Sequence, residues 1–242
     1  MWPAFSLNRP LLWTGLAALS ASIWLPGVAL RLAAASLVAL GVVGLALAQR
    51  PWRALLADHA LQHRWLAATV AVTLMWQLRA QAVDWLTLHL MFTALLTLVF
   101  KVPLALLSCL LVNLAMVVLG RVAWPLLGVN LLVTGVVPAL VMVLVWRLVD
   151  RRLPDNLMVF LFVCGFFGTA LATLAAGLSA VGLMALGASD PEVMHQALEY
   201  ARFLPLLMPS EAFISGMLLS ILLVYHPSWV ATFNDHRYID TK

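Results

Sequence analysis

The sequence predicts an all-α fold: a polytopic membrane bundle of about seven to eight transmembrane helices, forming a single integral membrane domain over 1–242. Three observations predict this class. Hydrophobic residues make up 64% of the chain, charged residues make up only 10%, and the mean hydropathy is +1.02. A soluble domain of this length does not need so much apolar surface. The chain therefore has almost no mass outside the membrane.

Eight apolar segments are candidates for membrane-spanning helices, because a bilayer core of about 30 Å requires about 20 apolar residues per helix. Two of them, 65–79 and 85–100, are short, so seven full crossings is an open alternative to eight. Prolines lie at or between the segment ends, where they typically stop helices. The segments are 11–25, 28–48, 65–79, 85–100, 103–120, 128–149, 156–186 and 203–225.

The first segment, 11–25, has the length of a signal-peptide core and follows Arg9. A second apolar run begins directly after Pro26, which favours a retained first helix. Cleavage near Ser20 is the alternative that the sequence leaves open. On the favoured interpretation, the N-terminal helices cover 11–48.

The basic residues are scattered singly or in pairs near segment ends, so the net charge of +4 indicates membrane topology and not a nucleic-acid surface. When successive loops are assigned alternately to the two sides of the membrane, ten basic residues lie on the side of both termini and four lie on the other side. Positive charge marks the cytoplasmic side. The sequence therefore predicts an even number of crossings with both termini in the cytoplasm. The ten are Arg9, Arg50, Arg53, Arg64, Lys101, Arg147, Arg151, Arg152, Arg237 and Lys242.

Segment 156–186 carries two adjacent rows of small residues at four-residue spacing. Such rows let helix backbones approach closely, which drives helix packing in lipid. The pattern predicts close packing and indicates nothing about chemistry. One row is Gly165, Thr169, Thr173 and Gly177, and the other is Gly168, Ala172, Ala176 and Ala180.

Glu211 is the only charged residue in the apolar stretch Phe203–Tyr225. A carboxylate inside a membrane helix costs roughly 2.5–3.5 kcal/mol, and such residues usually face a bundle interior or a water-filled cavity. Pro205 and Pro209 remove backbone donors at the same level, which predicts a weakened helix. Two interpretations are open: Glu211 marks an ion or substrate path, or it pairs with an arginine of a neighbouring helix.

Polar and sulfur-bearing residues from six segments gather, in this orientation, in the outer half of the membrane. This asymmetry predicts a pocket that opens to the outside. Imidazole suits nickel, copper or zinc, and thioether favours copper(I), but the spacing contains no metal fingerprint and each residue has an alternative role in helix packing. The candidate metal ligands are His89, Glu211, Met91, Met208 and Asn130, with Arg79, Asp84 and Asn113 as supporting residues.

The remaining residues that could be reactive do not indicate an enzyme. Cys109 and Cys164 lie in the middle of apolar runs, as inert packing cysteines do. The sequence contains no glycine-rich phosphate loop and no nucleophile elbow. If the protein takes part in energised transport, a partner must bind the ATP.

Residues 88–148 and the C-terminal part carry a resemblance to a known family. His89 opens one segment, Val102-Pro103 makes a turn, and Gly128-Val129-Asn130 leads into a later segment. These features resemble the CbiM-like permeases, the cobalt- and nickel-type substrate-capture subunits (S components) of energy-coupling factor (ECF) transporters. The likeness covers about 77–238 and includes a C-terminal motif similar to that of a bacterial branch whose substrate is unassigned. That motif contains Glu211, Gly216, Trp229, Phe233, Asp235 and Tyr238.

The resemblance implies a multi-pass protein of the bacterial inner membrane that delivers a cobalt, nickel or similar cation to separate ATPase and transmembrane coupling subunits. It also implies a metal site made of the N-terminal amine, a histidine at position two and a histidine that opens a later helix. His89 matches the last of these. Position two is Trp2, and Pro3 removes a backbone donor, so the usual site cannot form here and other ligands must take part.

Three functional hypotheses follow. In the first, a capture subunit binds a transition metal or small ligand: His89 coordinates, Glu211 neutralises charge or orients His89, and Arg79 pairs with Glu211 or Asp84 when the site is empty. In the second, the chain is a scaffold of a larger membrane complex and the polar cluster serves helix packing. A metal-dependent membrane enzyme is the third, and it would need three ligands and an open position.

Overall fold

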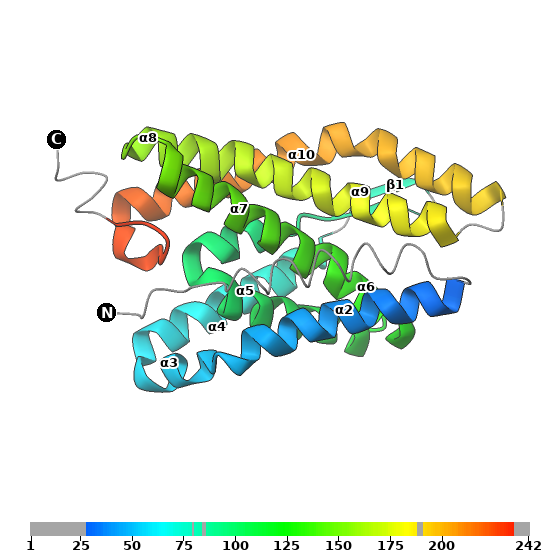
Figure 1. Cartoon of the computed structure of the whole chain (residues 1–242), viewed down its shortest axis with the longest axis horizontal. Helices are drawn as coiled ribbons and strands as arrows, with labels where there is room; N and C mark the ends of the chain where they lie inside the picture. Colours follow the sequence, from blue (N-terminus) through cyan, green and yellow to red (C-terminus); the bar gives the residue numbers. More distant parts are fainter. Residues whose placement is uncertain (1–27, 79, 84–85, 188–190, 235–242) are drawn as a thin grey trace.

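The structure, a computed structural model, describes residues 28–78, 80–83, 86–187 and 191–234. Within these ranges the chain forms helices that run mostly along one long axis, together with one small β-hairpin (Figure 1). The helical elements are α2 Val28–Ala48, α3 Pro51–Ala57, α4 His59–Met75, α5 Thr93–Val118, η1 Trp124–Leu126, α6 Leu127–Leu131, the π-helical η2 Leu132–Val136, α7 Val137–Arg152, α8 Leu157–Val159, the π-helical η3 Phe160–Gly168, α9 Thr169–Gly187, α10 Pro191–Tyr225 and η4 Pro227–Trp229. The strands are β1 Ala80–Val83 and β2 Leu86–Leu88.

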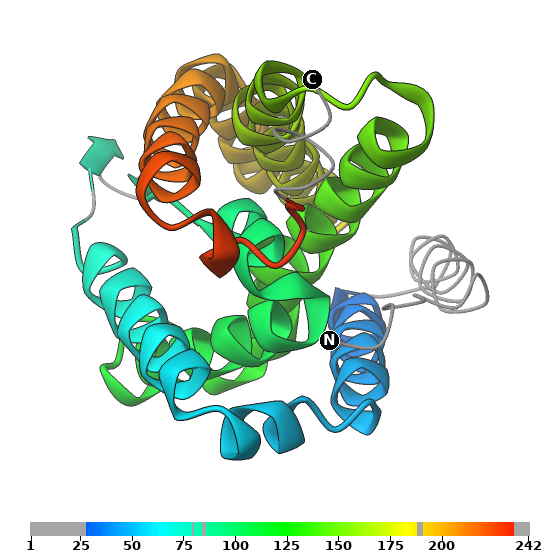
Figure 2. The same cartoon turned by 90° about the vertical axis from the view of Figure 1, so that its left-hand side faces the viewer.

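The packing order places α5 at the core. α10 packs on α9, α9 on α7, α7 on α5 and α5 on α4, while α2 lies against α5 and α6. The end-on view shows α5 enclosed between these groups (Figure 2). A helical membrane bundle is therefore confirmed.

The number of crossings is smaller than predicted in the part of the chain that is described. By length and hydropathy, four helices there can span a membrane, or up to five if the bent pair Leu32–Ala48 and Pro51–Ala57 counts as one span. Segment 28–48 is α2. The prediction for segment 65–79 needs correction, because α4 begins earlier, at His59, and is not among the four candidates. Segment 11–25 lies outside the described residues.

α5 has the length and hydropathy of a single span, yet it is two helical arms that meet at Lys101. Lys101 has φ 62 and ψ 168, which no helix contains. The Thr93 hydroxyl lies 3.4 Å from the sulfur of Cys109, whereas sixteen residues of continuous helix would separate them by roughly 24 Å. The chain therefore enters, turns back at Lys101 and returns, as a re-entrant hairpin with a short arm, 93–100, and a long arm, 102–118.

The predicted start of the helical segment 85–100 needs correction. Residues 86–88 form β2, which pairs antiparallel with β1, and the helix begins only at Thr93. Phe92, just before it, has the left-handed backbone conformation, φ 58, which turns the chain into the short arm. A short arm of this kind needs less than a full bilayer thickness of apolar sequence, which is why the segment looked short.

α10 is longer than predicted and has no break. It begins at Pro191, so the polar stretch before residue 203 is its first three turns and not a loop. Pro205 and Pro209 lie inside the helix without interrupting it, contrary to the weakening expected from their missing donors. The parts of α10 on either side of these prolines are long and pack against α9, and this packing keeps the helix continuous at both positions.

The two rows of small residues in η3 and α9 pack against two different helices. A methyl group added at Gly165 would meet Leu219 of α10 at 2.9 Å, and one at Gly177 would collide with Leu204 of the same helix. A methyl group at Gly168 would instead meet Val145 of α7 at 2.9 Å. The prediction that this segment packs closely is confirmed, with one row on α10 and the other on α7.

The two ends of the bundle carry different loops. At one end, Arg64 and Lys101 share a cavity with the residues of η4. α3, which contains Arg53, and α8 lie at the same end (Figure 1). α8 follows the last turn of α7, which contains Arg151. We call this the basic end. Arg121 lies with residues of α9 and α10 at the opposite end.

Candidate functional site

Glu211 lies where α10 meets the start of α5, and only 2% of it is exposed. One carboxylate oxygen accepts a hydrogen bond of 2.7 Å from the backbone N–H of Met91, and the other accepts one of 2.5 Å from the N–H of Phe92. Phe92 is the N-cap residue of α5. The carboxylate therefore holds the turn through which the chain enters the short arm.

This arrangement offsets the cost of a carboxylate in the membrane. Hydrogen bonds to a charged group contribute about 1.5–3 kcal/mol each, and the insertion cost is roughly 2.5–3.5 kcal/mol. The N-terminus of a helix also carries partial positive charge, which favours an anion there. The partners that the structure shows for Glu211 are backbone amides, whereas the sequence suggested an arginine. Arg79, the arginine in question, lies outside the described residues.

His89 follows β2, and its ring packs against the indole of Trp76 with ring centroids 4.4 Å apart. Its Nδ1 lies 3.4 Å from the carbonyl of Leu90. The indole N–H of Trp76 reaches the carbonyl of Met91, also at 3.4 Å. The imidazole is thus positioned by the same short segment whose amides bind Glu211.

A small cavity of about 60 Å³ lies beside this segment. His89 and Met91 line it from the chain before α5. Thr134 of η2 and Tyr200 of α10 also line it. The cavity therefore brings together an imidazole, a thioether and two hydroxyl groups from three parts of the fold.

Asn113 and Asn130 belong to a hydrogen-bonded network next to this cavity. The amide of Asn130 donates to the side-chain oxygen of Asn113 at 2.6 Å, and the amide of Asn113 donates to the carbonyl of Cys109 at 2.9 Å. The hydroxyl of Thr134 donates to the carbonyl of Asn130 at 2.8 Å, and that of Thr93 donates to the carbonyl of Thr134. The network ties both arms of α5 to α6 and η2.

The other predicted site residues are less central. Met208 is partly exposed on α10, and its neighbour Leu207 lines the small cavity instead. Besides its bond to Asn113, Asn130 lines a separate, mostly apolar groove of about 570 Å³ at the end opposite the basic end. Arg79 and Asp84 lie outside the described residues.

Sequence reasoning missed three residues of this region: Thr93, Thr134 and Tyr200. Both threonines are buried, at 0% and 5% exposure, and both bond to backbone carbonyls. A threonine one turn after Asn130 was a visible signal, because buried hydroxyls in membrane helices need acceptors. Nothing in the sequence indicated Thr93, since its role depends on the reversal of the chain at Lys101.

The donor set is sparse for a resident metal. Within the described ranges, no three His, Cys, Asp or Glu side chains come together in a group that could hold a metal ion. The imidazole and thioether at the small cavity are soft or intermediate donors, which suit transition metals. So few ligands suit a site that binds a metal ion weakly enough to release it as a transported substrate better than a site that retains a metal permanently.

A bundle of apolar helices that buries a carboxylate, an asparagine and several threonines around a re-entrant hairpin defines a polytopic membrane protein with a polar interior. Intramembrane ionisable residues of this kind mark transport proteins more than any other class. The sequence model of the CbiM family, described as the cobalt uptake substrate-specific transmembrane region, matches residues 15–229, and the chain belongs to that family.

The family match extends the resemblance seen in the sequence, because it begins well before residue 77 and includes α2 and α4. No curated protein and no solved structure matches the chain significantly. Family membership makes the chain a substrate-specific membrane component of metal uptake, which is a transporter role.

Proposed function

We propose that this chain is the capture subunit of an ECF transporter and takes up a transition-metal cation at the small cavity beside His89. The observation that supports this proposal most directly is the pairing of His89 and Met91 in one cavity within a family of metal-uptake components. An imidazole and a thioether are both good ligands for copper, and imidazole suits nickel, cobalt and zinc as well.

The size of the cavity favours a cation over an organic substrate. About 60 Å³ leaves room for an ion with a water ligand, whereas pockets for organic ligands usually enclose about 300–1,000 Å³. Tyr200 and Thr134 supply oxygen atoms at the same cavity. We propose that Met208 and Asn130 act from its margin, where neither lines the cavity itself.

Glu211 supplies negative charge close to this cavity. Its two oxygens are each used by one backbone N–H, and each keeps a further lone pair. We propose that it lowers the cost of bringing a cation to His89, because a buried carboxylate attracts positive charge strongly where water is scarce. Because backbone amides already hold the Glu211 carboxylate in place, it attracts the cation without a rearrangement when the cation binds.

The orientation of the bundle supports an opening to the outside of a bacterial inner membrane. We propose that the basic end faces the cytoplasm, as the positive-inside rule favours, so that the small cavity and the network of Asn113 and Asn130 would lie toward the other side. Separate ATPase and coupling subunits would complete the transporter, and copurification with them from the native membrane would test that part of the proposal.

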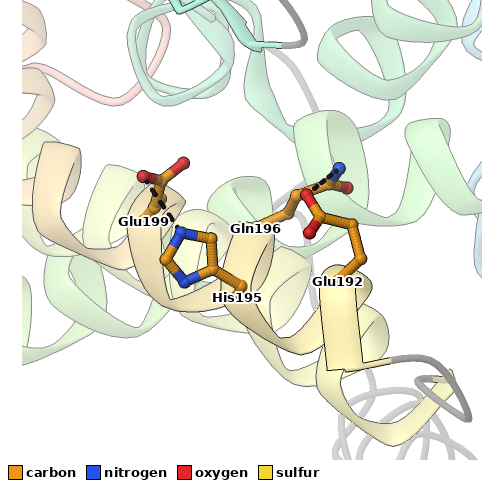
Figure 3. Close-up of polar contacts among 4 residues, drawn as sticks. All are labelled: Glu192, His195, Gln196 and Glu199. Atoms are coloured by element: carbon orange, nitrogen blue, oxygen red, sulfur yellow. Dashed lines mark hydrogen bonds and ion pairs between the residues drawn. The ribbon is translucent and has the colours of Figure 1, made fainter.

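Removing the imidazole is expected to abolish metal capture. The purified His89→Ala protein should bind nickel, cobalt, copper or zinc at least about tenfold more weakly than the unchanged protein, since loss even of a supporting group costs 10–100-fold in affinity. Calorimetry and elemental analysis of the washed protein measure this. The matched control is His195→Ala: His195 is exposed on α10, where it pairs with Glu199 at 3.4 Å (Figure 3), and its removal should leave binding unchanged.

The second candidate function is that of a scaffold in a larger membrane complex. One observation favours it: the hydrogen bonds that the structure shows for Glu211, Asn113 and Asn130 go to groups of the chain itself, as in a packing network. If neither the unchanged protein nor His89→Ala binds any of the four metals, the capture proposal fails and the scaffold function stands.

A further inference from the structure

A second cavity, of about 370 Å³, lies at the basic end of the bundle, far from the small cavity in the fold. Three separate parts of the chain line it: the start of α4, the tip of the re-entrant hairpin and the residues from Ser228 to Phe233. The charged groups that line it are Asp58, Arg64 and Lys101. Neither the proposed metal site nor the family description uses this cavity.

The charge balance of this cavity is positive. Asp58 is the N-cap of α4, and its carboxylate accepts a hydrogen bond of 3.0 Å from the N–H of Leu61. Among the described residues, neither Arg64 nor Lys101 forms an ion pair with a carboxylate. Two cations of the described residues therefore face the cavity, and Asp58, the one acidic group among the described residues that line it, already serves as a helix cap.

Arg64 is held in place over the cavity. Its Nε–H donates to the carbonyl of Ala60 at 3.1 Å, and its guanidinium lies 5.1 Å from the ring centre of Trp229. The Trp229 indole also stacks on the ring of His226, with centroids 4.2 Å apart. A guanidinium fixed in this way loses little freedom when it binds an anion.

Lys101 occupies a backbone conformation that normally requires glycine. Its φ of 62 and ψ of 168 cost a residue with a side chain about 1–3 kcal/mol. The carbonyls just before it, of Leu98 and Val99, accept hydrogen bonds from Thr232 and Ala231, which fix the tip of the hairpin. A strained position that carries a cation where glycine would fit is typical of a ligand clamp.

We propose that the cavity at the basic end binds a phosphate group through Arg64 and Lys101. Arginine presents a planar fork of donors to phosphate oxygens and lysine adds a point charge. The phosphodiester of an anionic lipid headgroup is one source, because basic pockets on the cytoplasmic side of membrane proteins bind such headgroups. A free phosphate ester is the other source of the same chemistry.

The test uses the full-length protein in detergent with phosphatidylglycerol, phosphatidylcholine, glycerol 3-phosphate and inorganic phosphate as probes. Native mass spectrometry counts bound lipid, and calorimetry measures the soluble phosphates. We expect phosphatidylglycerol to bind in preference to phosphatidylcholine, and Lys101→Gly and Arg64→Gln each to weaken that binding about tenfold, the equivalent of one lost charge-assisted hydrogen bond.

Two features keep the outcome decisive. Lys101→Gly relieves the backbone conformation, so its melting temperature without lipid should equal or exceed that of the unchanged protein, and lost binding cannot then be ascribed to unfolding. Arg152→Gln removes an exposed cation from the last turn of α7 at the same end and should bind lipid normally.

Equal affinity for glycerol 3-phosphate and phosphatidylglycerol would assign the site to free phosphate esters. Equal binding of both lipids together with no binding of either soluble phosphate, or an equal loss in Arg152→Gln, would overturn the proposal.

Discussion

Glu211→Gln is expected to lower the free energy of unfolding by about 2–4 kcal/mol. The carboxylate now accepts from the N–H groups of Met91 and Phe92, one on each oxygen. Glutamine keeps one acceptor and places an NH₂ group against the second N–H, which leaves a buried donor without a partner. Thermal unfolding in detergent, followed by circular dichroism, measures the loss.

The effect should extend beyond stability. The segment that Glu211 holds carries His89 and Met91, both of which line the small cavity. When its amides are released, the turn at Phe92 loses the group that fixes it, and the imidazole loses its defined position against Trp76. Metal affinity measured at a temperature where the variant is still folded should therefore fall as well.

A matched control is available on the same helix. Glu192 lies exposed in the first turn of α10 and interacts with the amide of Gln196 at 3.3 Å (Figure 3). Glu192→Gln makes the same chemical change at a surface position, where substitutions usually alter stability by less than about 0.5 kcal/mol. A melting temperature for Glu211→Gln equal to that of Glu192→Gln would show that the carboxylate does not hold α5.

Gly128→Ala is expected to destabilise the protein by about 1–3 kcal/mol, the usual cost of overpacking a core. Gly128 of α6 faces Ser36 of α2, and an added methyl group would lie 2.7 Å from the Cα atom of Ser36. Carbon atoms in contact normally stay about 3.5–4.0 Å apart. Because the Cα and Cβ atoms of Ser36 both obstruct the methyl group and no side-chain rotation can move them, the two helices must separate.

That separation would disturb the polar network as well. Asn130 lies two residues after Gly128 on the same short helix and donates to Asn113 on the long arm of α5. Thermal unfolding of Gly128→Ala, together with hydrogen exchange of the Asn130 side-chain amide, would record both effects.

Gly44→Ala is the control, because a methyl group at Gly44 in α2 would meet nothing within 4 Å. Replacing glycine by alanine inside a helix normally stabilises it by roughly 0.5–1 kcal/mol. The two substitutions are chemically identical and should act in opposite directions. A gain in stability from Gly128→Ala would contradict the close approach of α2 and α6.

Several features of the fold could be predicted from the sequence alone. The bounds of α2 followed from an uninterrupted apolar run between Pro26 and Pro51, and the packing rows of α9 followed from glycine and alanine at four-residue spacing. Both are local patterns, repeated at the period of the helix. The start of α10 at Pro191 lies before the predicted span 203–225, because that span was delimited by apolar residues and the first turns of α10 are polar.

The candidate site was predicted only in part. Buried carboxamides and a buried carboxylate in apolar segments are rare enough to mark a polar interior, and Asn113, Asn130 and Glu211 are indeed buried or half-buried in hydrogen-bonded positions. Their partners could not be predicted, because these lie between 17 and 120 residues away in the chain. Whether His89, Met91 and their neighbours bind metal stays a prediction.

The sequence by itself determined that this protein is a helical membrane bundle with polar groups inside, because hydropathy and helical spacing are properties of each segment alone. Only the tertiary structure decided that the arm before Lys101 begins as late as Thr93, and that Glu211 meets the backbone of Met91 and Phe92. The start of that arm depends on the left-handed turn at Phe92, which composition and periodicity do not record. The partner of a buried charge is likewise set by which segments lie side by side, and no local pattern records that.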